Sequence, residues 1–189
     1  SEADLEASAL AASCGSDYFD QSALAAYFNT ILGSEEADLE ERSIALWGSA
    51  ALGQPVLKDI NELLGNLSGG GAAGELPGEV QLNLLLAKTF AGDGANTKAL
   101  AQSFVTKWSE ELGGARRANI GQGGDERLKA TARMAMLSQL LDLPEAEGLY
   151  QYTVENQSEA DYFLLEQLIF LKAGLRTLPQ TASFSYTLD

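Results

Sequence analysis

The sequence contains 189 residues, of which 46% are hydrophobic and 21% are charged, and its formal net charge is −15. This length and composition are typical of one globular domain rather than of a disordered segment. The acidic charge disfavours nucleic acid and anionic membranes as partners, because both are bound by clustered Lys and Arg. The lack of His removes the commonest general base and zinc ligand, and the single cysteine, Cys14, excludes an internal disulfide.

Hydrophobic periodicity predicts four pairs of helices and a ninth helix after them. The expected pairs are about 2–13 with 20–32, 36–52 with 55–66, 79–91 with 95–112, and 125–141 with 144–155. The last helix is expected over about 158–173. Asp20, Ser34 and Ser158 precede predicted helices and are candidate N-caps. The segments 68–78 and 113–124 are rich in glycine and are expected to be loops.

The turns inside the helix pairs recur along the chain. Gly15, Gly53 and Gly92 lie in three of these turns and are 38 and 39 residues apart. The fourth turn, at Asp142, follows after 50 residues, and the loop 113–124 accounts for the extra length. Such spacing predicts an all-α helical-hairpin repeat, either an α/α-toroid or an α-solenoid arc.

The two helices of a pair differ in their hydrophobic pattern. The first helices are apolar on nearly every side, whereas the second helices carry one apolar stripe, which in 95–112 includes Leu100 and Leu112. A helix that is apolar on every side is buried, and a striped helix lies at the surface. We therefore expect an inner and an outer layer of helices. The final helix should also be buried, because Leu164, Leu168 and Leu171 are among its many apolar residues.

The two ends of the chain indicate a piece of a larger protein. The chain starts without Met, and residues 182–189 form an alternating, strand-like run. We therefore expect a helical domain over 1–181 and the start of a following β-segment over 182–189. No apolar run reaches the ~18 residues that a membrane-spanning helix needs, so this segment is not expected to insert into a membrane.

Several apolar segments resemble a known family. Within residues 36–188, these are "IALWGSAALGQPVL", "EVQLNLLLAKTFAGDG", "LEQLIFL" and "SFSYTL". They look like the helical toroid of bacterial α-macroglobulin-like and related cell-surface proteins, a fold shared with terpenoid cyclases. The resemblance implies an extracellular or cell-surface location. The family's thioester chemistry does not carry over, because Leu164 stands where its C-x-E-Q motif would need Cys before Glu166 and Gln167.

A second resemblance points to a different location. The segment 79–104 resembles a tetratricopeptide unit around its Gly-Asp turn. This likeness implies an intracellular adaptor, so a cytoplasmic location stays open. The spacing of the turns is longer than the repeat of that family, which favours the toroid.

Charged residues give the candidate sites. The only basic cluster contains Arg116, Arg117, Arg127, Lys129 and Arg133. It is a candidate to dock the acidic N-terminal region or an acidic partner, and ordinary surface charge is the simpler interpretation.

A concave acidic cleft would need carboxylates on the inner helices. The candidates for this are Glu79, Asp125, Glu126 and Glu166.

The sequence contains no pattern that identifies a catalytic, cofactor-binding or metal-binding residue. The preferred hypothesis is a non-catalytic structural or protein-interaction domain whose partners are other domains of the same protein or another protein. Arg116, Arg117 and Glu166 are the candidate partner or ligand surface. The alternatives are a toroid enzyme or carbohydrate-binding module with an acidic concave cleft, and an intracellular tetratricopeptide-like adaptor.

Overall fold

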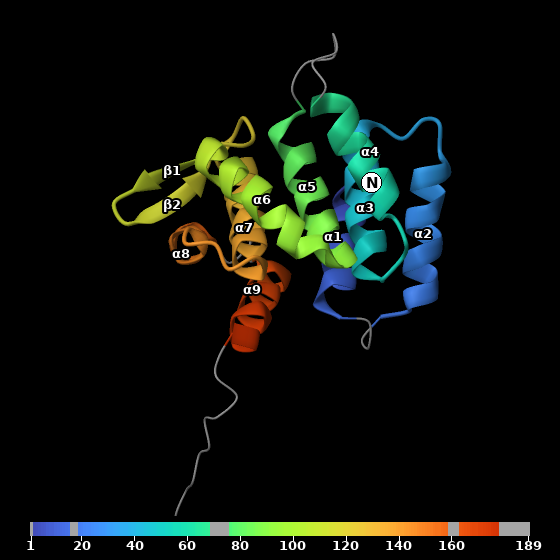
Figure 1. The fold of residues 1–189 in the computed structure, drawn as a ribbon. Helices are drawn as coiled ribbons and strands as arrows, with labels where there is room; N and C mark the ends of the chain where they lie inside the picture. Colours follow the sequence, from blue (N-terminus) through green and yellow to red (C-terminus); the bar gives the residue numbers. More distant parts are fainter. Residues whose placement is uncertain (1, 16–18, 69–75, 159–162, 178–189) are drawn as a thin grey trace, which may run out of the picture.

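The computed structural model describes residues 2–15, 19–68, 76–158 and 163–177 (Figure 1). Within these ranges the chain is mostly helical, with one small two-stranded sheet. The elements in chain order are α1 (Glu2–Cys14), α2 (Gln21–Gly33), α3 (Leu39–Ala51), α4 (Leu57–Ser68), α5 (Gly78–Lys88), η2 (Thr89–Asp93), α6 (Gly94–Trp108), β1 (Ser109–Leu112), β2 (Ala115–Ala118), α7 (Gly124–Leu140), α8 (Ala146–Asn156) and α9 (Leu164–Thr177). The all-α class is therefore confirmed in outline. The predicted strand-like tail, 182–189, lies outside the described residues.

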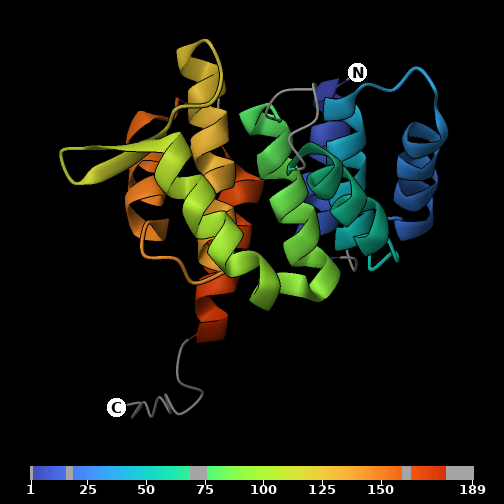
Figure 2. The ribbon, with the colours of Figure 1, turned by 45° about the horizontal axis from the view of Figure 1, so that its top comes forward.

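The odd-numbered helices pack against one another in sequence, and α3, α5 and α7 form the interior. α3 packs against α1 and α5, α7 packs against α5 and α9, and α9 packs against α1. The even-numbered helices lie outside them, with α2 against α3 and α8 against α7 (Figure 2). Every residue from Ser43 to Ala50 of α3 is buried. Leu84 of α5 and Leu137 of α7 are also fully buried, as their apolar surroundings in the sequence predict.

Two predictions of burial were wrong. In α6, Leu100 is 55% exposed because the helix packs through Ala101 and Phe104 instead. In α9, Leu164, Leu168 and Leu171 are about half exposed. The opposite side of α9 packs against α1 and α7, and no described element covers the side that carries these leucines. An apolar pattern on every side of a helix does not itself supply a neighbour for each side.

The helix starts follow local hydrogen bonds. The prediction of Asp20 as an N-cap is confirmed, since its Oδ1 accepts a hydrogen bond from the Ala23 amide at 3.0 Å. The prediction of Ser34 was wrong. Asp38 caps α3 instead, and it forms a capping box with Glu41, so that the helix begins three residues later than expected. Ser158 does not cap α9 either, because that helix begins only at Leu164.

A β-hairpin replaces the predicted end of a helix and the start of a loop. Helix α6 ends at Trp108, and β1 and β2 pair antiparallel, with Glu110 opposite Arg117 and Glu111 opposite Arg116. Leu112, which was expected on a helical stripe, lies in β1 and is 41% exposed. The turn residues Gly113 and Gly114 both have positive φ, a conformation that favours a tight two-residue hairpin turn. The hairpin projects from the side of the molecule (Figures 1 and 2).

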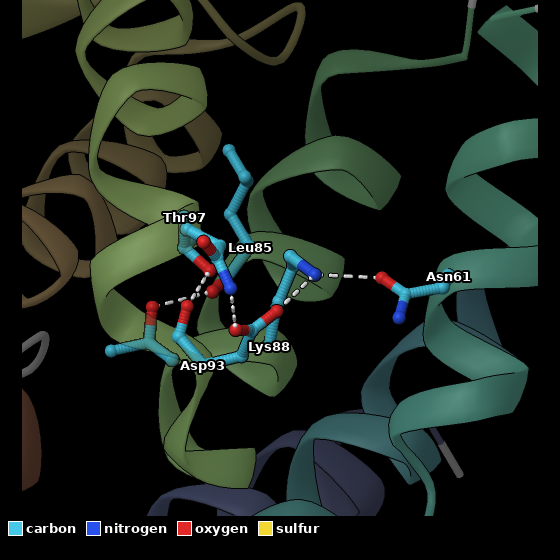
Figure 3. A network of polar contacts seen from close by, with 7 residues as sticks. Asn61, Leu85, Lys88, Asp93 and Thr97 are labelled. Atoms are coloured by element: carbon cyan, nitrogen blue, oxygen red, sulfur yellow. Dashed lines mark hydrogen bonds and ion pairs between the residues drawn. The ribbon is translucent and has the colours of Figure 1, made fainter.

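The turn between α5 and α6 is fixed by a polar network (Figure 3). Gly92 has a φ of 85°, and Gly15 and Gly53 likewise have positive φ in their turns. Glycine adopts such a conformation without steric strain. The Lys88 ammonium donates to Asn61 Oδ1 of α4 at 2.7 Å and to Asp93 Oδ2 at 2.5 Å. These bonds join α4, α5 and the turn before α6. None of the described helices is both long and apolar enough to cross a membrane.

Candidate functional site

A polar cleft of about 710 Å³ lies among the inner helices. Its walls come from α1, α3, α5 and α7, from Trp108 at the end of α6, and from residues 119–122 after the hairpin. The charged residues that line it are Glu6, Glu40, Glu79, Glu126, Lys129 and Arg133. The cleft is therefore lined by more carboxylates than cations.

The inner wall of the cleft is an ion-pair network between α1 and α7. Arg133 Nη2 lies 2.7 Å from Glu6 Oε1, and Lys129 pairs with the other oxygen of the same carboxylate. Glu6 and Arg133 are both nearly buried, and the Arg133 guanidinium lies over the ring of Trp47, 5.7 Å from its centroid. Buried charges of this kind need such partners, because they have lost their hydration. The network therefore holds the wall in one arrangement.

Glu166 of α9 lies near this network but does not line the cleft. It is 7% exposed. Burial raises the pKa of the Glu166 carboxyl group, and the nearby Glu6 carboxylate raises it further. The backbone amide of Glu166 and the Arg133 cation lower this pKa in part. The structure thus places Glu166 within the helix packing, close to the charges that form the cleft wall.

The rim of the cleft carries Glu126, which is fixed by the backbone. Its Oε2 accepts hydrogen bonds from the amides of Gln122, at 2.5 Å, and Gly123, at 3.4 Å. These bonds lower the pKa of Glu126. Glu79 also lines the cleft, whereas Asp125 is exposed and lies outside it. Of the four carboxylates predicted for an acidic cleft, the structure brings two into the cleft.

Three buried polar atoms of the cleft walls have no hydrogen-bond partner among the described residues: Asn83 Oδ1, Trp108 Nε1 and Arg133 Nε. The other end of the Asn83 amide donates to Ser43 Oγ at 3.1 Å, so its orientation is fixed. A buried polar atom without a partner costs about 1–3 kcal/mol. The cleft walls therefore contain some hydrogen-bonding capacity that no described protein group uses.

Arg116 and Arg117 do not join this site. Both lie on β2, where Arg116 Nη1 donates to Ser109 Oγ at 2.9 Å and Arg117 pairs with Glu110. Hydrogen bonds to Glu110 and Tyr152 raise the pKa of Arg117. The structure thus divides the predicted basic cluster between the hairpin and α7.

The α7 part of the basic cluster contacts the N-terminal helix. Lys129 and Arg133 dock Glu6 of the N-terminal helix, which was one of the proposed roles. Sequence reasoning had not picked out Glu6 or Glu40 as cleft residues. The available signal for Glu6 was a carboxylate within the apolar run Leu5–Ala12 of α1.

Several large aromatic residues serve the helix packing and not the cleft. Trp47 is fully buried, and Tyr150 stacks on Phe170 of α9 with ring centroids 4.2 Å apart. Trp108, by contrast, lines the cleft. Within the part of the chain that the structure describes, no group of three or more acidic or cysteine residues is arranged to hold a metal ion.

Comparisons with known proteins give no relative. No protein-family model, no curated protein and no solved structure matches this chain.

Proposed function

We propose that this chain is a non-catalytic helical interaction domain, and that its polar cleft holds a cationic side chain of a partner. The partner is another domain of the same protein or a second protein. The observation that carries the proposal is the acidic lining of the cleft, to which Glu6, Glu40, Glu79 and Glu126 contribute. A lysine or arginine side chain would complement these groups in charge and hydrogen bonding.

The state of the carboxylates favours binding over acid–base catalysis. A catalytic pair needs two carboxyl groups whose environments push their pKa values apart at the place where a substrate binds. Among the described residues, the carboxyl group with a raised pKa is that of Glu166, which is buried in the helix packing. Glu126 in the cleft has a lowered pKa and is fixed by two amides. A carboxylate that backbone amides hold in place suits a rigid recognition surface better than proton transfer.

The packing order of the inner helices supports the architecture expected for such a domain. Each odd-numbered helix contacts the next, and α9 returns to α1. We propose that this arrangement is an arc or ring of the α/α-toroid type. The proposal also keeps the cell-surface location that the family resemblance implies.

The experiment is an NMR titration of the labelled protein with Nα-acetyl-lysine amide. We expect the backbone amide signals of residues 119–126 to shift, and Glu79→Gln to weaken the binding. Glu147→Gln is the matched control, because Glu147 is exposed on α8 and lies outside the cleft. A titration without shifts in the cleft, or equal effects of the two substitutions, would contradict the proposal.

A carbohydrate-binding cleft is the second candidate. Trp108 lies in the cleft beside carboxylates and the Asn119 segment, and sugar rings are bound by such combinations of an aromatic face and polar groups. Titration with N,N′-diacetylchitobiose distinguishes the two candidates. Shifts of the same amides with this sugar, and none with the lysine probe, would favour the second candidate. Hydrolysis of the sugar would show that the domain is an enzyme.

A further inference from the structure

Helix α9 carries a row of exposed leucines on the side that faces away from α1 and α7. The row consists of Leu164, Leu168, Leu171 and Leu175, and each of these side chains is between 48% and 68% exposed. Figure 1 shows α9 at the edge of the molecule, with its C-terminal end beyond the other helices. We call these four residues the leucine face. A row of this size is unusual on a surface, because exposed leucines normally occur singly.

The spacing of the leucine face is that of a helix-pairing seam. Its members are separated by four, three and four residues, which is the alternation of the a and d positions in a coiled coil. From Leu164 to Leu175 the row is about 16 Å long at 1.5 Å per residue. A partner helix with the same periodicity would match every leucine, whereas an extended strand, whose side chains alternate with a period of two, would not.

An apolar groove continues the leucine face towards α1. It has a volume of about 480 Å³ and is lined by Cys14, Phe19, Leu165, Leu168, Ile169 and Lys172. Phe19 is 44% exposed, so the groove adds an aromatic side chain to the apolar surface. Leu168 belongs to both features. The two features therefore form one continuous surface, separate from the polar cleft.

The charges beside this surface determine which partner fits. Lys172 and Arg176 are the exposed charged residues of α9, since Glu166 is buried. Lys172 also lines the groove, and its ammonium donates to the Cys14 carbonyl oxygen at 2.9 Å. Carboxylates flanking an apolar helix would complement these cations, and cations there would be repelled. A second copy of this chain is disfavoured, because each copy has a net charge of −15.

We propose that the leucine face and its groove dock an amphipathic helix of a partner protein, with acidic residues beside the apolar side of that helix. The proposal is independent of the ligand in the polar cleft. It can fail while the cleft proposal holds, because the two surfaces share no lining residue.

The test uses two fluorescent peptides of about 18 residues with leucine at the a and d positions. One carries Glu at the flanking positions, and the other carries Lys. At about 0.15 M salt, which screens the distant acidic charges of the chain, we expect the Glu peptide to bind at least about tenfold more tightly. Lys172→Glu together with Arg176→Glu should reverse this preference. A bound peptide should also slow alkylation of Cys14.

The matched variants are Leu171→Asp and Leu100→Asp. Both replace a leucine that is about half exposed, but Leu100 lies on α6, away from the leucine face. We expect loss of binding in the first variant and none in the second. The proposal is overturned if neither peptide binds, if the Lys peptide binds as well, if Leu171→Asp has no effect, or if the surface instead forms a dimer or binds lipid vesicles.

Discussion

The ring of Phe28 lies directly against the α-carbon of Gly48. A Cβ atom at position 48 would come within 2.2 Å of Phe28 Cζ, and both residues are buried where α2 meets α3. Close helix packing at this point therefore depends on the absence of a side chain. In α3, glycine is required by its neighbour rather than by its backbone conformation.

Gly48→Ala is expected to destabilise the protein. The ring of Phe28 has to move away, and overpacking of this kind costs about 1–3 kcal/mol. Urea unfolding measures the loss. Gly33→Ala is the control, because a Cβ there meets nothing within 4 Å. We expect that variant to be as stable as the parent or slightly more so, since alanine favours the helix. Equal stability of the two variants would show that the Phe28 contact tolerates a methyl group.

Glu166→Gln is expected to stabilise the protein at neutral pH. Burial raises the pKa of Glu166, so the folded state binds its proton more tightly than the unfolded state does. The group therefore favours folding below its unfolded pKa, and this contribution is lost as the pH rises through the raised value. The uncharged amide avoids that loss. The gain over the parent should disappear in acid, which urea unfolding at a series of pH values measures.

Asp93→Asn should show the opposite pH dependence. Hydrogen bonds from Lys88 and Asn96 lower the pKa of Asp93, so this carboxylate stabilises the fold above its unfolded pKa. The contribution is lost as the pH falls through the lowered value. The variant should therefore be less stable than the parent at pH 7 and approach it in acid. A difference that does not change with pH would show that the ionised form has no special role.

Cys14 should react slowly with thiol reagents. Burial raises the pKa of its thiol, and the nearby Lys172 cation opposes this only in part. The thiolate, which is the reactive form, is therefore scarce at neutral pH. Alkylation followed by mass spectrometry should be slower in the folded protein than in urea. A folded protein that reacts as fast as the unfolded chain would contradict the burial of this thiol.

The helices could be predicted because local pattern determines them. Asp20 lies at the start of a periodic apolar segment, and its role as a cap follows from chemistry within three residues.

The hairpin was missed because Ser109–Ala118 contains no β-branched or aromatic residue. Its signals were the Gly113–Gly114 pair and the opposite charges on either side. These signals are weak until the register brings Glu110 and Arg117 together.

The cleft could be predicted only in part, because its residues are distant in the sequence. Glu79 and Glu126 were candidates as carboxylates on inner helices. The partnership of Glu6 with Lys129 and Arg133 depends on how α1 packs in the interior, which no local pattern records. The leucine face was misjudged for a related reason. The pattern of α9 showed which sides are apolar but not which sides have a neighbour.

The ion pairs of Glu6 have a consequence for how the protein is made. Of the described helices, α1 is synthesised first, whereas Lys129 and Arg133 are synthesised only with α7, and α9 follows later still. Glu6 and the side of α1 that packs against α9 therefore gain their neighbours late in synthesis. Until then α1 exposes a carboxylate and an apolar surface, and transiently exposed apolar surface is a site at which chaperones bind.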